Sequence, residues 1–167
     1  MEVIEKVLTR LDNLNIDYQL IKHKPVYTIG EINQINEIDI SFVLKNLFLT
    51  DDKKQHYYLV LLKNDQQLDL KKLRKVLKSR RLTFASEEDL NKYLGLKKGA
   101  VSPLGILNDH DKIVDVIIDK EIEKMIKIGI HPNINTATIY LSFTDLLKVI
   151  ESNGNRHCFI ELNDNGI

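Results

Sequence analysis

A lysine and an asparagine interrupt an apolar run in the first third of the chain. The run reads FVLKNLFL, with Lys45 and Asn46 at its centre. Both side chains need polar partners or water, which the interior of a strand rarely supplies. An ammonium and an amide fixed on a strand could position a polar substrate and stabilise negative charge that develops on it. The alternative is a strand end that emerges into solvent.

Two further segments carry unusual polar groups. Residues 129–138 read GIHPNINTAT and hold more hydrogen-bonding groups than a turn between two apolar strands requires. Residues 95–105 read GLKKGAVSPLG, a loop with three glycines and a proline that could expose backbone amides near Ser102 and Gly105. For this loop the alternative is a helix C-cap followed by an ordinary turn.

A fourth polar feature is a cluster of basic residues between Asp69 and Arg81, which we call the basic strip. It consists of Lys71, Lys72, Arg74, Lys75, Lys78, Arg80 and Arg81. The strip could bind the phosphates of a nucleic acid, and the alternative is a solvated helix face. The whole chain has 24 basic and 24 acidic residues, so its net charge is zero. This balance argues against a protein that coats nucleic acid indiscriminately.

Other chemistries find little support in the residues. The chain has no P-loop, no dinucleotide fingerprint and no G-x-S-x-G elbow. Its five histidines lack zinc-ligand spacing, and its single cysteine cannot build a structural zinc site. The sequence NDHD at 108–111 indicates a turn better than a hard-metal site. We expect Cys158 to be a buried small hydrophobe, diverging from His157 on the same strand. The sequence therefore predicts no metal, no cofactor and no thiol nucleophile.

The elements that must position these groups alternate irregularly along the chain. Periodicity and capping patterns predict helices over residues 2–14, 28–36, 69–77, 86–95 and 142–154. They predict strands at 18–23, in a hairpin over about 45–63, and at 82–86, 112–119, 125–130, 137–141 and 157–162. This order favours an α+β fold with a mixed sheet flanked by helices, in a single domain over residues 1–167.

The sequence lacks the features of a membrane or secreted protein, and this indicates the cellular compartment. No apolar run has the length that a bilayer span needs, and the N-terminal segment MEVIEKVLTRLDNL is not a signal peptide. One cysteine rules out an internal disulfide and suits a reducing environment. We therefore expect a cytoplasmic protein with no membrane contact.

Four segments, in this order, resemble the YbaK/ProX family, the relatives of the editing domain of bacterial prolyl-tRNA synthetase. They are KNLFLTD with the following YYLVLL, then LTFASEEDLNKYLG, GAVSPLG and HPNINTAT. Within the family, the chain resembles the stand-alone deacylases that remove alanine misattached to proline tRNA. One departure is local: relatives often carry glycine and a polar residue where this chain has Ser41 and Val43.

The resemblance implies a site and a reaction. Lys45, Asn46, Gly129 and His131 match the family's catalytic positions, and the helix that begins at residue 28 matches one that covers the site. The pocket would be lined by Val43, Leu44, Ser102, Pro103, Gly105, Ile130, Pro132 and Asn133. The reaction would be hydrolysis of the ester in a mischarged tRNA, without metal or cofactor. Lys45 would act as an electrostatic positioner, since an amine with a pKa normally near 10.4 is a poor base at pH 7.

The implied partners are a mischarged tRNA, read here as proline tRNA, and transient contact with prolyl-tRNA synthetase. The basic strip would bind the tRNA backbone. Two alternatives stay open. One is a deacylase with another substrate, such as cysteine on proline tRNA or serine on another tRNA. The other is a non-catalytic RNA-binding or regulatory module on the same scaffold.

Overall fold

The strands of the protein form two sheets. The computed structural model describes residues 2–162. A mixed five-stranded sheet has the order β4 (Leu82–Phe84), β2 (Leu44–Asp51), β3 (Tyr57–Lys63), β5 (Val114–Asp119) and β8 (His157–Ile160). An antiparallel three-stranded sheet has the order β1 (Gln19–Lys22), β7 (Ala137–Leu141) and β6 (Ile128–Ile130). The predicted α+β class with a mixed sheet is confirmed, and its strands divide between these two sheets.

The helices begin where the sequence places capping residues. They are α1 (Val3–Asn13), α2 (Ile29–Ile32), α3 (Leu70–Leu77), α4 (Glu87–Leu94) and α5 (Phe143–Asn153), with short 3-10 turns η1 (Ile40–Phe42), η2 (Pro103–Asn108) and η3 (Lys120–Lys124). The Ser86 and Ser142 hydroxyls each accept a hydrogen bond from the backbone N–H three residues later. Such caps satisfy N–H groups that the first helical turn leaves without a partner. Among residues 2–162, no helix has the length and apolar character needed to cross a bilayer.

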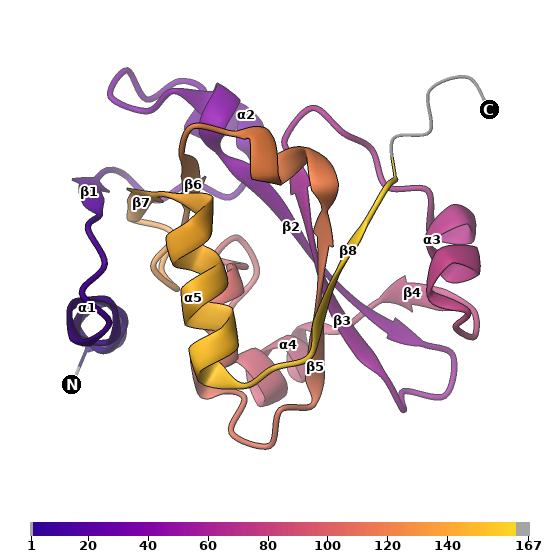
Figure 1. Cartoon of the computed structure of the whole chain (residues 1–167). Helices are drawn as coiled ribbons and strands as arrows, with labels where there is room; N and C mark the ends of the chain where they lie inside the picture. The colour runs from indigo at the N-terminus through magenta and orange to yellow at the C-terminus, as the bar shows by residue number, and fades with distance from the viewer. Residues whose placement is uncertain (1, 163–167) are drawn as a thin grey trace.

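Both faces of the five-stranded sheet are covered. Side chains from β3 alternate between two clusters: Leu59 and Leu61 pack with α1, α4 and α5, whereas Val60 and Leu62 pack with Leu73 of α3. Figure 1 shows this arrangement, with α3 on one side of the sheet and α1, α4 and α5 on the other. Burial on both faces explains why the strand sequence YYLVLL is continuously apolar instead of alternating.

The two sheets meet at one β-bridge, between Val43 and Gly129. On the same edge of β2, strand β4 pairs only with residues 49–51, and the Ala85 N–H donates to the Phe48 carbonyl. Between these contacts, residues 44–47 pair with β3 on one edge and, in the part of the chain that the structure describes, with no strand on the other. This gap in the edge of β2 is where the candidate site lies.

Several predicted elements are shorter in the structure. The helix expected over 28–36 ends as α2 at Ile32, although Thr28 caps it as predicted. The strand expected over 125–130 is reduced to β6 at Ile128–Ile130. The loop expected over 95–105 gives way at Pro103 to η2. Its amides are not exposed: the Leu104 N–H donates to the Ser102 hydroxyl and the Gly105 N–H to the Ser102 carbonyl.

The expectation of a buried cysteine is wrong, because Cys158 is exposed. It lies on β8, an edge strand with a neighbour on one side only, so the sheet does not enclose it. Partial desolvation and the nearby Asp115 carboxylate nevertheless raise the pKa of the thiol, which lowers its thiolate content.

Candidate functional site

A pocket of about 190 Å³ opens at the gap in the edge of β2. Its walls come from four places: the segment around α2, the start of β2, the loop after α4, and the strands of the smaller sheet. The lining residues are Tyr27, Thr28, Ile29, Ile32, Val43, Leu44, Lys45, Asn46, Gly99, Val101, Ile130, His131 and Thr138. The structure therefore brings together Val43, Leu44, Lys45 and Asn46 with Ile130 and His131, which are far apart in the sequence.

Asn46 offers the pocket an unused hydrogen-bond acceptor. Its Nδ2 lies 3.4 Å from the Val101 carbonyl and 3.5 Å from the Leu44 carbonyl. Two carbonyl neighbours require an N–H donor, which fixes the orientation of the amide. Its Oδ1 is buried and has no hydrogen-bond partner within residues 2–162. A buried acceptor without a partner is costly, so this oxygen is suited to a donor that a ligand brings.

Lys45 leaves β2 on the opposite face from Asn46, and its ammonium donates to the backbone carbonyl of Gln66. The Gln66 side chain is itself fixed at both ends: its Oε1 accepts from the Lys63 N–H, and its Nε2 donates to the buried Asp119 carboxylate. An ammonium has three N–H donors, so the bond to Gln66 leaves two for other acceptors. The loop after β3 therefore fixes the position of the Lys45 ammonium and leaves two of its N–H donors for other acceptors.

His131 and His23 have defined hydrogen bonds on the wall formed by the smaller sheet. The Nδ1 of His131 lies 2.9 Å from the Ala137 carbonyl, so Nδ1 carries the proton and Nε2 is the acceptor in the neutral ring. Burial lowers the pKa of His131, and the nearby His23 lowers it further, against the opposing effect of the Ala137 bond. The Nδ1 of His23 donates to the Lys24 carbonyl, and its Nε2 accepts from the Thr138 hydroxyl at 3.0 Å.

Gly129 is needed for the close approach of the two sheets. A Cβ atom at this position would lie 2.9 Å from Cε1 of Tyr140 and 3.2 Å from Cγ2 of Val43. The Tyr140 hydroxyl in turn contacts Asp39, accepting from its N–H and donating to its carbonyl, which fixes η1 and the start of β2. The apolar Val43, which stands where relatives often carry a polar residue, is buried against this tyrosine.

The other predicted pocket residues lie behind the walls. Ser102, Pro103 and Gly105 are buried in η2 and its N-cap, and Pro132 is buried in the turn after β6. Asn133 is buried with its Nδ2 donating to the Leu104 carbonyl, which connects this turn to η2. These residues support the loop and the turn that carry Val101 and His131, and they do not themselves line the pocket.

Sequence reasoning missed Tyr27, Gly99 and Val101 among the lining residues. Tyr27 packs against Gly99, where a Cβ would lie 2.8 Å from the tyrosine ring and where φ is +87°. The unusual glycine content of the 95–105 loop marked this segment correctly, but the important positions precede Ser102. No sequence pattern indicated Tyr27, which is an exposed aromatic residue next to α2.

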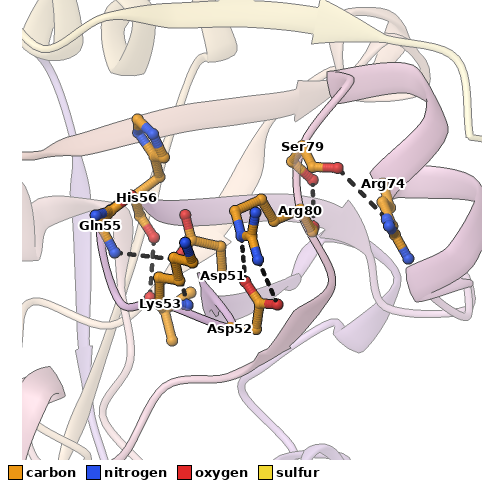
Figure 2. Close-up of polar contacts among 9 residues, drawn as sticks. Asp51, Asp52, Lys53, Gln55, His56, Arg74, Ser79 and Arg80 are labelled. Atoms are coloured by element: carbon orange, nitrogen blue, oxygen red, sulfur yellow. Dashed lines mark hydrogen bonds and ion pairs between the residues drawn. The ribbon is translucent and has the colours of Figure 1, made fainter.

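The basic strip lies on and after α3, which Figure 1 shows on the other side of the five-stranded sheet from α4 and α5. None of the residues that line the pocket belongs to the strip. Its residues Lys71, Arg74, Lys75, Lys78 and Arg81 are exposed. Three members have partners within the protein: Arg80 forms a two-pronged ion pair with Asp52, Lys72 donates to the Leu162 carbonyl, and Arg74 donates to the Ser79 carbonyl. Figure 2 shows the Arg80–Asp52 pair beside the β2–β3 turn, together with the bond from Arg74 to the Ser79 carbonyl.

The NDHD segment forms a turn, as predicted. The carboxylate of Asp109 is buried and accepts hydrogen bonds from the Ile113 and Val114 N–H groups and from Asn155. These bonds engage three of the roughly four lone-pair sites of the carboxylate within the protein. Across residues 2–162 there is no cluster of three or more histidine, cysteine or acidic side chains that could hold a metal ion.

Comparisons with known proteins assign the family. Residues 23–149 match the model of the aminoacyl-tRNA editing domain. The chain is 46% identical over 162 residues to the prolyl-tRNA editing protein ProX of Acetoanaerobium sticklandii, which covers 97% of this chain and 99% of that protein. The chain belongs to the aminoacyl-tRNA editing family.

Two further relatives extend this similarity. The prolyl-tRNA synthetase associated domain-containing protein 1 of Danio rerio is 34% identical over 143 residues, covering 84% of this chain and 77% of that protein. A crystal structure of a candidate trans-editing enzyme for prolyl tRNA synthetase has the same fold, with a TM-score of 0.73 at 17% identity over 96% of this chain and 98% of that one. The predicted family is confirmed, and prolyl-tRNA editing is the activity named for the 46% identical relative.

Proposed function

We propose that this member of the aminoacyl-tRNA editing family is a trans-editing deacylase that hydrolyses the ester between alanine and proline tRNA. The observation that carries this proposal is a small pocket in which the unpaired Oδ1 of Asn46 lies among apolar side chains. An α-ammonium group is a donor that fits this acceptor, and a short apolar side chain fits the surrounding walls. Both belong to an alanyl ester.

Selection by size explains why such an enzyme is useful. A synthetase pocket built for proline also admits the smaller alanine, and each missing methylene lowers binding by only about 1–3 kcal/mol. An editing pocket works in the opposite direction, since it admits the small side chain and clashes with the larger ring. The walls available for that clash are Ile29, Ile32, Val43, Val101 and Ile130.

The hydroxyl groups of the pocket favour alanine over serine. Thr28 accepts the Glu31 N–H as the cap of α2, and Thr138 donates to His23. Both hydroxyls are therefore engaged within the protein and offer little to a polar substrate side chain. A serine or cysteine side chain would lose water in this pocket and gain no strong partner in exchange.

The reaction needs a positioned water and stabilisation of the oxygen that becomes negative. Water adds to the ester carbonyl, the bond to the ribose oxygen breaks, and that oxygen takes up a proton. We assign Lys45 the role of an electrostatic positioner, with its free N–H donors directed at the terminal phosphate or the carbonyl oxygen. His131 presents a neutral Nε2 that can accept a hydrogen bond from the water or from a ribose hydroxyl.

The open edge of β2 can add a backbone donor. The Phe48 carbonyl faces β4, and residues two apart along a strand direct their backbone groups to the same edge. The backbone of Asn46 therefore faces the pocket side of the strand. An N–H on this edge is fixed by the sheet, so it can bind a developing oxyanion without reorganisation.

The experiment is a comparison of initial rates on alanyl-, cysteinyl- and prolyl-tRNA for proline. We expect rapid loss of the alanyl ester and slow loss of the prolyl ester. A preference for the cysteinyl ester would identify cysteine on proline tRNA as the substrate. If no ester were hydrolysed, the protein would be a non-catalytic module. The enzyme would act in the cytoplasm, where tRNA is charged, and adding prolyl-tRNA synthetase to the assay tests for the transient contact.

A further inference from the structure

A second hollow adjoins the pocket along the same edge of β2. It has a volume of about 370 Å³ and is lined by Asn46, Leu47, Phe48, Phe84, Ala85, Glu87, Leu90, Lys98 and Val101. Asn46 and Val101 line both hollows, so the two are adjacent and meet at these residues. The gap between β4 and the Val43–Gly129 bridge therefore holds two neighbouring spaces, only one of which the aminoacyl group needs.

Phe84 is the unusual residue of the second hollow. It is the last residue of β4, an edge strand, and the residue is 60% exposed. The ring contributes little to the core: Leu82, on the same face of the same strand, is buried against α3. A large exposed aromatic ring beside a ligand pocket indicates a surface on which a flat group can stack.

The chemistry of the substrate determines what must lie next to the aminoacyl pocket. In an aminoacyl-tRNA, the amino acid is joined through one ribose to the terminal adenine. A bound ester therefore places that base within one sugar of the aminoacyl group, in a space adjacent to the first pocket. The second hollow meets this condition, and stacking of a base on an aromatic ring is a general mode of single-strand recognition.

We propose that the second hollow binds the terminal adenosine of the tRNA, with the adenine stacked on Phe84. This inference rests on the proposed function and extends it to the nucleotide. The carboxylate of Glu87 can accept a hydrogen bond from the exocyclic amino group of adenine, and the exposed Lys98 lies where it can meet backbone phosphate. Arg81, three residues before Phe84, extends the basic strip toward the same edge.

The test uses the absence of tryptophan from the chain. A Phe84→Trp variant has a single indole at the stacking position, and its emission is followed during titration with uncharged proline tRNA. We expect strong quenching by tRNA that ends in the terminal adenosine and little quenching by the same tRNA with that adenosine removed. Ile113→Trp places the indole on an exposed position outside both hollows, and its emission should not depend on the terminal adenosine.

Kinetics give a second, independent readout. Stacking contributes equally to the bound substrate and the transition state, so Phe84→Ala should raise KM by on the order of tenfold and leave kcat nearly unchanged. Phe84→Tyr, which keeps the ring, should restore KM. Circular dichroism of each variant checks that the fold is retained.

Two results would overturn the inference: equal quenching of the Phe84→Trp variant by both tRNAs, or a wild-type KM for Phe84→Ala. The titration uses uncharged tRNA and does not depend on hydrolysis. If the wild-type protein hydrolyses no ester but the quenching still requires the terminal adenosine, the proposed function fails and the adenosine site stands.

Discussion

Lys45 and Asn46 are consecutive in β2, so their side chains leave the strand on opposite faces. Both residues line the pocket: Asn46 has a buried oxygen without a partner, and the Lys45 ammonium donates to the carbonyl of Gln66, whose side chain is bonded to Asp119. A charge held in this way is already ordered before the substrate arrives, which is what makes electrostatic stabilisation effective. In the reaction that we propose, the pair combines two roles, recognition by the amide and charge stabilisation by the ammonium.

The first prediction concerns the positive charge of Lys45. Lys45→Ala should lower kcat/KM on the alanyl ester by about a hundredfold or more, because the reacting centre then lacks one preorganised donor. Single-turnover hydrolysis measures the effect, and thermal unfolding shows whether the fold is intact. Lys63→Ala removes an amine one residue before the loop that holds Lys45 and serves as the matched control. Wild-type rates in a folded Lys45→Ala variant would remove Lys45 from the reaction.

The second prediction concerns the pH dependence of stability. Burial lowers the pKa of His131 in the folded protein below the ordinary value of 6.5, so the unfolded chain binds a proton more readily. The contribution of His131 to stability is therefore complete above about pH 7 and is lost as the pH falls through 6.5 toward the folded pKa. His131→Asn, which keeps a donor for the Ala137 carbonyl, should show a smaller fall in melting temperature between pH 7.5 and 5.5. The exposed His110→Asn is the control and should retain the wild-type fall.

At the scale of the elements, local patterns predicted most of the fold. The hairpin, the caps at Thr28, Ser86 and Ser142, and the buried strands follow from residue type and spacing, and the structure has them. The way the two sheets meet could not be predicted, because it involves a bridge between Val43 and Gly129, 86 positions apart by their numbers. Long-range contacts of this kind leave no periodic signal.

Only part of the candidate site could be predicted, because local patterns mark individual residues but do not show which distant segments pack together. Lys45 and Asn46 stood out because polar groups in an apolar run require an explanation, and His131 because its segment carries more polar groups than a turn requires. Gly99, Val101 and Tyr27 became wall residues only through tertiary packing of the loop against the segment before α2. The exposure of Cys158 was missed because β8 has an apolar sequence but an edge position.

The third prediction tests the junction between the sheets. Gly129→Ala places a methyl group against Tyr140 and Val43, so β6 must move away from β2. Overpacking of this kind costs about 1–3 kcal/mol, and we expect a lower free energy of unfolding together with a larger KM. Gly30→Ala is the matched control, since its nearest neighbour would be the Thr28 hydroxyl oxygen at 3.8 Å. Equal stability of the two variants would show that the sheets tolerate separation.

At the scale of the whole molecule, a neutral protein must bind a polyanion through a local surface. We propose that the basic strip on α3 is that surface, and β4 leads from it to the edge on which both hollows open. A tRNA held along this path would present its 3′ end to the pocket while its stem contacts α3. The partners of Lys72 and Arg80 within the protein leave Lys71, Lys75 and Lys78 as the better phosphate contacts.

The fourth prediction follows from that path. Replacing Lys71, Lys75 and Lys78 by glutamine should weaken tRNA binding and reduce the slope of log affinity against log salt by roughly 0.7–0.9 for each phosphate that is no longer neutralised. Filter binding at several salt concentrations measures both quantities. Arg80→Gln is the control, because its ion pair with Asp52 already occupies the guanidinium, and it should change the slope less. An unchanged slope in the triple variant would identify the strip as a solvated helix face.

The gap in the edge of β2 also bears on how specificity can change during evolution. The groups proposed for chemistry lie on β2 and at the end of β6, which the core holds in place. Much of the remaining wall comes from α2 and the loop at Gly99–Val101, two peripheral segments that neither sheet requires for its pairing. Substitutions there can reshape the space around the amino-acid side chain at little cost to the core. Substitutions in these two peripheral segments can in this way give one hydrolytic scaffold new substrates, while the reacting groups keep their geometry.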